Sequence, residues 1–492
     1  MSDDYPPGQD PRRWRALAVT LLAGFMGLLD VSIVNVAFPS MQHALNASLS
    51  DVQWVVSGYA LTFGLALVAG GRLGDGWGRK RMFLIALAAF ILTSVLAGAA
   101  TTALWLVMGR LLQGFAAGLL TPQNSGLIQE LFRGAERGRA FGLFGATVGI
   151  STAVGPVLGG LILAVFGAEH GWRWVFYVNV PIGAVALLLA MRLLPGRQRK
   201  SASADIDVVG ALLLGLAVVG VLFPLVQSEN HGLAKYWWMF PIAAVLGFAF
   251  IRWEARVVRR GRAPLLDVRL FTQTPGYSAG AAIGAVYFCG FAGIWLVMAL
   301  FFQDGLHYTP LESGLAVTPF AIGSAVAAVV AGRAVARWGR KVTVAGLVLV
   351  VLGLASVAVI VLLVPPSSAG FGVAFPLLVA GVGGGAVISP NTTLTLECVP
   401  TRMAGVAGGA LQTGQRVGTA IGTAVLAAAY RAGVGEGNAY ERGASAAMFG
   451  AVAVVLVALG IALWELWSRH SRISAGTATT TETAAATDVH RS

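Results

Sequence analysis

Residues 71–81 read Gly-Arg-Leu-Gly-Asp-Gly-Trp-Gly-Arg-Lys-Arg, and a related stretch, Gly-Arg-Ala-Val-Ala-Arg-Trp-Gly-Arg-Lys, returns at 332–341. Each stretch directly follows one long apolar run and directly precedes another. A pattern that recurs at equivalent places indicates that the two halves of the chain are duplicated. Ala336 stands in the second copy where Asp75 stands in the first, so any function of that acid is expected in the first half only.

The composition around these stretches is that of an integral membrane protein. Of the 492 residues, 57% are hydrophobic and 11% are charged, whereas soluble domains carry roughly 25% charged residues. The net charge of +12 is spread over short clusters between apolar runs and forms no basic stripe interleaved with aromatic residues. This placement is typical of the positive-inside rule and argues against nucleic-acid binding.

Helices are the only structures that satisfy the backbone of such apolar runs inside a bilayer, and each crossing needs about 20 residues. We therefore predict an all-α polytopic membrane protein with fourteen transmembrane helices. The predicted helices cover residues 15–38, 52–71, 82–101, 103–127, 138–166, 172–194, 206–227, 236–253, 277–302, 312–332, 341–364, 371–395, 403–430 and 446–468.

The basic residues predict the orientation and the organisation of the chain. They gather in alternate loops, which places both termini in the cytoplasm of a cell membrane protein. The tail Ser-Ala-Gly-Thr-Ala-Thr-Thr-Thr after residue 473 is small, polar and repetitive, and is expected to be disordered. We predict five parts: a cytoplasmic segment 1–14, a six-helix bundle 15–200, two inserted helices with a basic cytoplasmic loop 201–270, a second six-helix bundle 271–468, and a disordered cytoplasmic tail 469–492.

The first copy of the repeated stretch carries the first set of candidate residues. Its glycines allow a tight turn and a close approach between helices. Asp75 can accept hydrogen bonds from the N-terminus of a neighbouring helix, while the basic residues can pair with acids or lipid phosphates. The alternative is an ordinary basic loop. The candidates of this conformational latch are Gly71, Asp75, Gly78, Arg79 and Lys80.

Four other predicted helices carry polar or glycine-rich patterns. A charge inside a membrane helix is costly, so it normally faces a cavity or a partner; glycines at short spacing favour close packing, and proline kinks a helix. The residues are Asp30 and Asn35 in 15–38; Arg110 and Gln113 in 103–127; Gly149, Gly155, Pro156, Gly159 and Gly160 in 138–166; and Gln412, Gln415 and Arg416 in 403–430.

In these stretches the chain resembles the major facilitator superfamily, and within it the drug/proton antiporter branch with fourteen helices. The resemblance covers about residues 14–468 and rests on 29–39, 71–81, 149–160, 172–181 and 411–416. It implies the major facilitator fold and alternating access. It makes Asp75 a latch between the bundles, reaching the start of helix 403–430. The Gly-Pro-x-x-Gly-Gly ending of helix 138–166 is that of exporters, and helix 403–430 lacks it.

Asp30 and Arg110 are expected at similar depths, roughly 13 and 10 Å from the outer ends of their helices at 1.5 Å per residue. Burial raises the pKa of a carboxylate and a nearby arginine lowers it, so a moving partner could switch Asp30 between holding and releasing a proton. We hypothesise that Asp30 is the proton-coupling site and Arg110 its modulator. A static ion pair is the alternative. Asn35, Gln113, Gln412, Gln415 and Arg416 are candidates to bind substrate, or to make structural bonds between helices.

The sequence lacks the motifs that are typical of several other function classes. The phosphate-binding pattern of ATP-driven pumps does not occur, and the six histidines lie in loops or tails. We therefore expect no enzyme activity, no cofactor, no metal and no nucleic-acid partner, and a monomer whose partners are protons, membrane lipid and a small-molecule substrate. The favoured function is proton-driven export of small lipophilic molecules such as drugs, antibiotics or secondary metabolites. Proton-coupled uptake of a solute and a non-transport membrane regulator remain alternatives.

Overall fold

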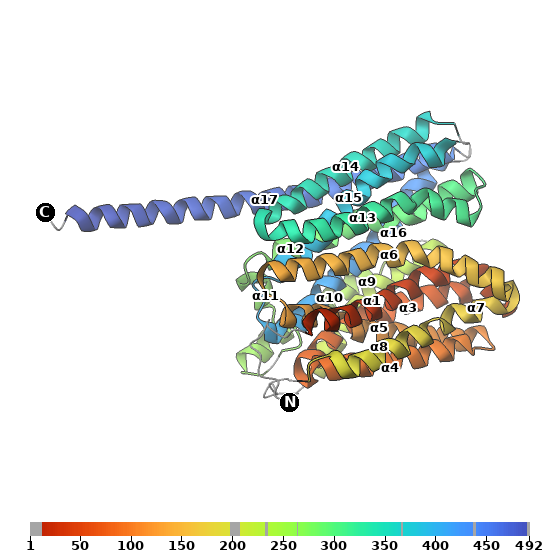
Figure 1. Ribbon diagram of the computed structural model, residues 1–492, viewed down its shortest axis with the longest axis horizontal. Coiled ribbons are helices and arrows are strands. Elements are labelled where there is room, and N and C mark those ends of the chain that lie inside the picture. The colour runs from red at the N-terminus through yellow and green to blue at the C-terminus, as the bar shows by residue number, and fades with distance from the viewer. Residues whose placement is uncertain are drawn as a thin grey trace.

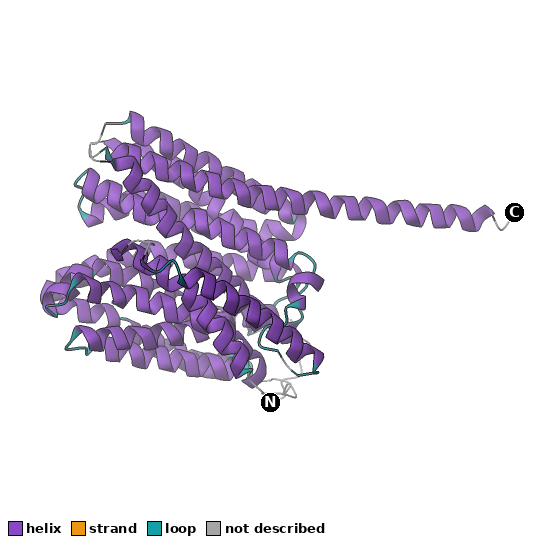
Figure 2. Ribbon diagram, turned by 180° about the vertical axis from the view of Figure 1, so that it is seen from behind, coloured by secondary structure: helices purple, strands orange, loops and turns teal. Residues whose placement is uncertain are grey.

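The computed structural model describes residues 12–489 apart from 197–206, 232–234, 263, 366–367 and 436–438. The regular structure of these residues is helical throughout (Figure 2). Since a lipid-facing backbone must satisfy its hydrogen bonds within each segment, this is the architecture that the apolar runs require. The expectation of an all-α membrane protein is confirmed.

The helices form two bundles that lie side by side (Figure 1). The N-terminal bundle contains α1 (Arg13–Val36), α2 (Phe38–Ala44), α3 (Leu49–Trp77), α4 (Arg79–Gly98), α5 (Ala103–Leu131), α6 (Gly134–Phe166), α7 (Ala168–Tyr177) and α8 (Asn179–Leu193). The C-terminal bundle contains α12 (Tyr277–Leu300), which runs into a π-helical turn (Phe301–Gly305), α13 (Pro310–Trp338), α14 (Arg340–Leu363), α15 (Ala369–Thr395), α16 (Ala404–Val434) and α17 (Tyr440–Val489). The bundles meet mainly where α6 packs on α13 and α3 packs on α16.

Two further helices link the bundles in sequence. The first, α9 (Val208–His231), packs against α3 of one bundle, α16 of the other, and α10 (Met239–Arg259). A short helix, α11 (Arg269–Gln273), then leads into α12. The inserted pair therefore lies beside the line along which the bundles meet.

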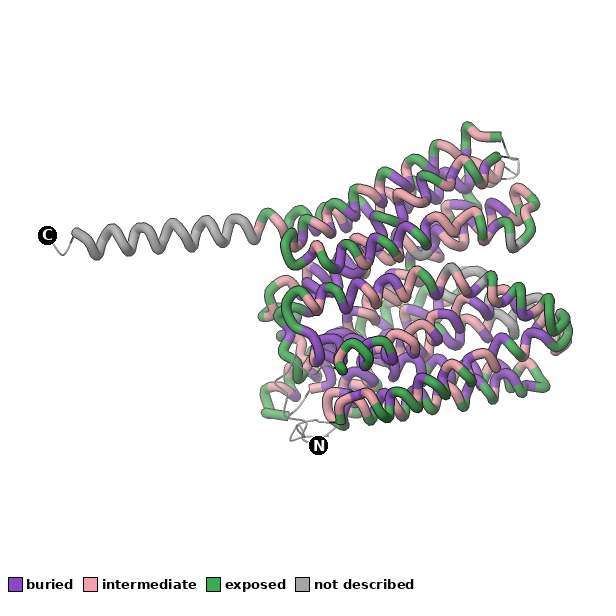
Figure 3. The backbone as a smooth tube through the Cα atoms, in the orientation of Figure 1, coloured by how far each residue is buried: buried purple, intermediate pink, exposed green. Residues whose placement is uncertain are grey.

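The outer surface of the bundles is apolar. Phe371 is 89% exposed, Leu363 74% and Leu104 72%. Exposed residues follow the outward faces of the helices and buried ones the inward faces (Figure 3). A continuous apolar surface of this kind fits contact with lipid.

The predicted number of fourteen spans is not confirmed. Among the described residues, twelve helices are long and apolar enough to cross a bilayer, and thirteen if the bent α6 is counted as one span. The remaining candidate, 236–253, is present as α10. Its last turns carry Arg252, Glu254, Arg256 and Arg259, and these charges set it apart from the other spans.

α17 continues as a helix to Val489, and its end projects beyond the bundles (Figure 1). The disordered cytoplasmic tail over 469–492 stays a prediction.

The repeated sequence occupies the same place in both bundles. In the first, α3 begins with a capping box of Ser48 and Asp51, and in the second, α13 begins with one of Thr309 and Glu312. Each of these helices ends at a single glycine with positive φ, 110° at Gly78 and 53° at Gly339, and the next helix starts at once. Glycine adopts this conformation without steric cost, so a one-residue turn reverses the chain.

Candidate functional site

A buried polar cluster lies inside the N-terminal bundle. It contains Asp30 on α1, Ser94 on α4, Arg110 and Gln113 on α5, and Asn179 at the start of α8, and we call it the Asp30 cluster. Each of these residues is at most 1% exposed. Four helices thus each contribute polar side chains to one point in an apolar interior.

The Asp30 carboxylate is fully hydrogen bonded. Arg110 Nη1 donates to Asp30 Oδ2 at 2.6 Å. Gln113 Nε2 and Asn179 Nδ2 donate to Asp30 Oδ1 at 3.0 and 2.8 Å. A buried charge is tolerated when it is both paired and hydrogen bonded, and Asp30 meets both conditions. The sequence placed Asp30 and Arg110 at similar depths, and the structure brings them into contact.

Arg110 has partners besides Asp30. Its Nε donates to the carbonyl of Val55 at 3.0 Å, and its Nη1 donates to Gln113 Oε1 at 2.7 Å. The Tyr59 ring lies 4.1 Å from Arg110 Cζ, a distance suited to a cation–π contact. These groups hold the guanidinium in place in addition to its pairing with Asp30.

For three members of the cluster, the sequence analysis assigned either another role or none. Gln113 was a candidate substrate ligand, but its Nε2 also donates to Ser94 Oγ at 2.6 Å, so its amide is committed to the cluster. Asn179 stands in the stretch 172–181 that carried the family resemblance, yet no role was assigned to it. Ser94 was missed, because one serine in an apolar helix gives no signal about what it faces.

The second group of candidates lies where α3 ends, and we call this end of the molecule the Asp75 end. The backbone N–H groups of Gly405 and Val406, at the start of α16, donate to Asp75 Oδ1 at 3.1 Å and Oδ2 at 2.9 Å. The carboxylate thus caps the N-terminus of a helix of the other bundle, where the exposed N–H groups and the helix dipole favour an anion.

Arg79 continues this contact between the bundles. Its guanidinium pairs with Asp75 at 2.9 Å and with Glu130 at 3.1 Å, and it donates to the carbonyl of Thr401 in the C-terminal bundle. Two glutamines and one arginine add hydrogen bonds across the same end: Gln129 to the carbonyl of Ala404, Gln412 to Ser125, and Arg137 to the carbonyl of Glu397. The bundles are therefore locked together at the Asp75 end.

Lys80, unlike Asp75 and Arg79, makes its hydrogen bonds within its own bundle. Its ammonium donates to the carbonyls of Met191 and Leu194 at 2.9 and 2.7 Å. A cation at the C-terminus of a helix is favoured by the helix dipole. Lys80 therefore ties α4 to the end of α8 within its own bundle and does not reach the other bundle.

Gly71 lets α3 and α16 approach closely, and this gives a test of the contact. A Cβ at Gly71 would collide with the backbone carbonyl of Gly405, whereas one at Gly76 on the same helix would meet nothing within 4 Å. We expect Gly71→Ala to destabilise the folded protein by about 1–3 kcal/mol through overpacking. Gly76→Ala should leave stability equal or slightly higher, because alanine favours helix. Thermal unfolding of the two purified variants measures this, and equal melting temperatures would contradict the close packing.

The glycines of α6 pack against two neighbouring helices, α1 and α13. Gly155 and Gly159 face Ser32 and Ile33 of α1, while Gly149 faces α13 at Ala321 and Ala325. Gly160 is exposed and meets no neighbour within 4 Å. The axis of α6 bends by 41° between 152 and 157, where Pro156 predicts a kink. The helix is thus fitted against its own bundle on one side and the other bundle on the opposite side.

The polar residues of α16 face the N-terminal bundle or α12. The Arg416 guanidinium lies over the Phe63 ring, with Cζ 4.5 Å from its centroid. Gln412 bonds Ser125 of α5 at 3.2 Å, and Gln415 lies next to Gly284 of α12. The side chain of Asn35, the remaining candidate, lies outside the described residues.

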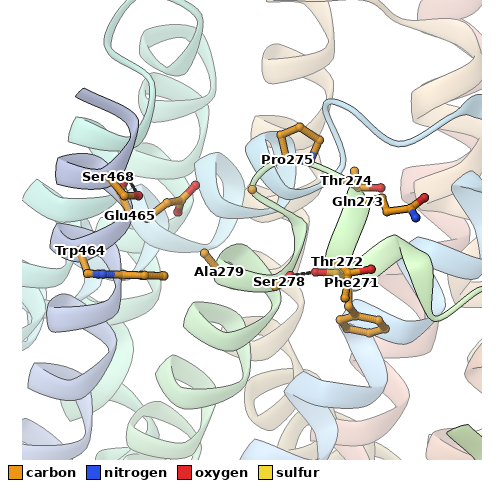
Figure 4. A pocket seen from close by; sticks show the side chains of 11 residues that line it. Phe271, Thr272, Gln273, Thr274, Pro275, Ser278, Ala279, Trp464, Glu465 and Ser468 are labelled. Atoms are coloured by element: carbon orange, nitrogen blue, oxygen red, sulfur yellow. Dashed lines mark hydrogen bonds between the residues drawn. The ribbon is translucent and has the colours of Figure 1, made fainter. Parts of the chain in front are cut away.

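A pocket of about 310 Å³ opens at the Asp75 end of the C-terminal bundle, between 271–279 and α17 (Figure 4). Beside it, Glu465 of α17 pairs with Arg340 at 2.8 Å. No residue predicted from the sequence to carry function lines this pocket. Among the described residues, no group of three or more His, Cys, Asp or Glu could hold a metal ion.

Comparisons with known proteins identify a family and several proteins of similar sequence. The family model described as "Major Facilitator Superfamily" matches residues 20–423 and 280–488. The chain is 37% identical over 421 residues to a probable actinorhodin transporter of Streptomyces coelicolor, covering 84% of this chain and 72% of that protein. It is 32% identical to the tetracenomycin C resistance and export protein of Streptomyces glaucescens, covering 86% and 77%. It is also 32% identical to the methylenomycin A resistance protein of Bacillus subtilis, covering 85% and 90%.

Solved structures share the fold. The human organic anion transporter MFSD10 matches with a TM-score of 0.65 and 14% identity, over 92% of this chain and 100% of that chain. The proton:xylose symporter XylE matches with a TM-score of 0.65 and 14% identity, over 91% and 94%. At this identity the match concerns the fold alone.

Proposed function

Because the chain belongs to the major facilitator superfamily, we propose that it is a proton-coupled antiporter that exports small lipophilic molecules across the cytoplasmic membrane by alternating access. It is a transporter and not an enzyme. Its relatives are named for the transport of, or resistance to, actinorhodin, tetracenomycin C and methylenomycin A, which supports antibiotics or secondary metabolites as its substrates. The finer placement that we propose is the drug/proton antiporter branch.

The observation that carries proton coupling is the buried pair of Asp30 and Arg110. When Asp30 is ionised, Arg110 balances its charge at 2.6 Å. When the carboxylate takes up a proton, Arg110 keeps Val55, Gln113 and Tyr59 as partners. Protonation thus removes the acid that balances Arg110, but it leaves the guanidinium held by hydrogen bonds and an aromatic ring. The loss of the ion pair on protonation ties the proton to the arrangement of the bundle, which is what a carrier that releases its proton on the other side requires.

The closed Asp75 end supports the alternating-access part of the proposal. Asp75 would act as the latch, holding the start of α16 while that end is shut and releasing it when that end opens. We place this end in the cytoplasm, because Arg79, Lys80, Arg137 and Arg340 gather there. The chain would be a monomer with both termini in the cytoplasm.

The proposed topology is fourteen helices arranged as six, two and six. α10 would be the fourteenth span, with its charged last turns in the cytoplasmic headgroup region. The packing of α9 against α3 and α16 supports a position for the inserted pair at the edge of both bundles. No cofactor is needed, since a transmembrane potential supplies roughly 2.3 kcal/mol per charge per 100 mV.

Everted membrane vesicles test the proposal. A pH gradient, acid inside, is imposed, and the accumulation of antibiotics from the families named above is measured with and without a proton ionophore. Accumulation that depends on the gradient, and partial collapse of the gradient when substrate is added, are expected. Accumulation only in right-side-out vesicles would instead assign the protein to uptake by symport, and no accumulation in either orientation would contradict transport of these compounds.

A further inference from the structure

Arg416 lies near the middle of α16, about 18 Å along the helix from its start at 1.5 Å per residue. Its side chain points to the other bundle, with Cζ 4.5 Å from the Phe63 ring of α3. The residue is only partly buried. A permanent positive charge is thus held between the bundles, close to the mid-depth of a hydrocarbon core of about 30 Å.

The buried arginines in the described spans each have an acid, whereas the partly buried Arg416 has none. Arg110 pairs with Asp30, Arg79 with Asp75 and Glu130, and Arg340 with Glu465. Within the described part of the chain, Arg416 makes neither a salt bridge nor a hydrogen bond, and its contact is the face of an aromatic ring. Because an uncompensated charge at this depth is costly, its retention calls for a counter-charge that arrives from outside the chain.

Aromatic rings connect Arg416 to the Asp30 cluster. Tyr59 and Phe63 are one turn apart on α3, with ring centroids 6.0 Å apart. Tyr59 lies against Arg110 and Phe63 lies against Arg416. The two rings thus form a continuous aromatic path from the proposed proton site to the guanidinium of Arg416. A flat ligand bound beside Arg416 would find an apolar aromatic face there.

We propose that Arg416 binds the negatively charged group of the exported substrate, which is an aromatic weak acid carrying a carboxylate or a phenolate. This inference rests on the proposed export function and names its substrate class. A guanidinium is planar and presents paired N–H donors that match a carboxylate. Asp30 is already neutralised by Arg110, so the charge left over to attract a ligand is positive.

The charge balance of the exchange is consistent with this assignment. An anion that leaves the cell and a proton that enters both move positive charge inward. An inside-negative membrane potential therefore drives both halves of the cycle, whereas it would oppose the exit of a cation.

A matched pair of probes tests the substrate class. The purified full-length protein in lipid nanodiscs is titrated with 9-anthracenecarboxylate and with 9-(aminomethyl)anthracene, which share one ring system and carry opposite charges at pH 7, and binding is followed by fluorescence anisotropy. The wild type should bind the carboxylate at least tenfold more tightly. Arg416→Gln should weaken carboxylate binding by about 30-fold and leave amine binding equal or stronger.

Two further variants separate charge from structure. Arg431→Gln removes an exposed arginine from the last turn of the same helix and should change neither affinity. Arg416→Lys keeps the charge without the planar fork and should retain the preference for the carboxylate at reduced affinity, even if Arg416→Gln fails to fold. Tighter binding of the amine by the wild type, or an unchanged carboxylate affinity in Arg416→Gln, would overturn the inference. Gradient-driven export of a cationic drug would overturn it while leaving the export function intact.

Discussion

Asp30→Asn is expected to reduce gradient-driven export by roughly 100-fold, the loss typical of removing a group that transfers a proton. The asparagine amide can keep hydrogen bonds with Gln113 and Asn179, but it cannot take up and release a proton. Export driven by the pH gradient should therefore fall to background, whereas binding of substrate should persist. Everted vesicles that contain equal amounts of wild type and variant measure the difference.

The substitution also has a structural effect that must be separated from the loss of coupling. It leaves Arg110 without its acid, and removing one partner of a buried ion pair destabilises a protein by about 3–5 kcal/mol. The double variant Asp30→Asn, Arg110→Gln removes both charges and should regain most of the lost stability.

The double variant decides between a proton site and a static pair. If Asp30 is the proton site, the double variant is stable but still fails to couple export to the gradient. If the two residues form only a structural pair, stability and coupled export return together, and the proton-coupling hypothesis is wrong. Thermal unfolding and vesicle transport on the same samples give both readouts.

The sequence alone predicts where the helices lie and which of them carry charged residues inside the membrane. Hydropathy finds a span wherever an apolar run is long enough, so twelve predicted spans, or thirteen with the bent α6 counted as one, correspond to described helices that fit a bilayer. The fourteenth, α10, is ambiguous. Its apolar start is typical of a membrane span, whereas its charged end is typical of a segment outside the hydrocarbon core. Asp30 and Arg110 could be matched by depth, since distance along a helix follows directly from residue number.

What the sequence leaves open is how each helix is rotated about its axis. In lipid every face can be apolar, so hydropathy does not say which side of α4 carries Ser94 inward, or that Gln113 joins the Asp30 cluster instead of facing a substrate. The family resemblance predicted that the hydrogen-bond donors for Asp75 lie near the start of helix 403–430. The two N–H groups that bind it belong to the backbone, and every residue but proline carries the same group.

Asp75→Asn is expected to shift the protein from the closed to the open arrangement at the Asp75 end. The carboxylate accepts from two backbone N–H groups with separate oxygens, and asparagine has one oxygen and no charge. Losing hydrogen bonds to a charged acceptor costs about 1.5–3 kcal/mol each. Since each 1.4 kcal/mol is tenfold in an equilibrium constant, the ratio of closed to open molecules should fall by roughly 10- to 100-fold.

Spin labels at Ala135 and Ala336, exposed residues on the two bundles, measure this shift after serine has replaced Cys289 and Cys398. The wild type should give one short distance, and Asp75→Asn should add a longer one. Asp51→Asn makes the same change at the exposed start of the same helix and should leave the distribution as in the wild type. Arg79 still pairs with Glu130 in the variant, so the distances report the loss of the Asp75 cap itself. An unchanged distribution in Asp75→Asn would mean that the contact between Gly71 and Gly405, and not the carboxylate, holds this end closed.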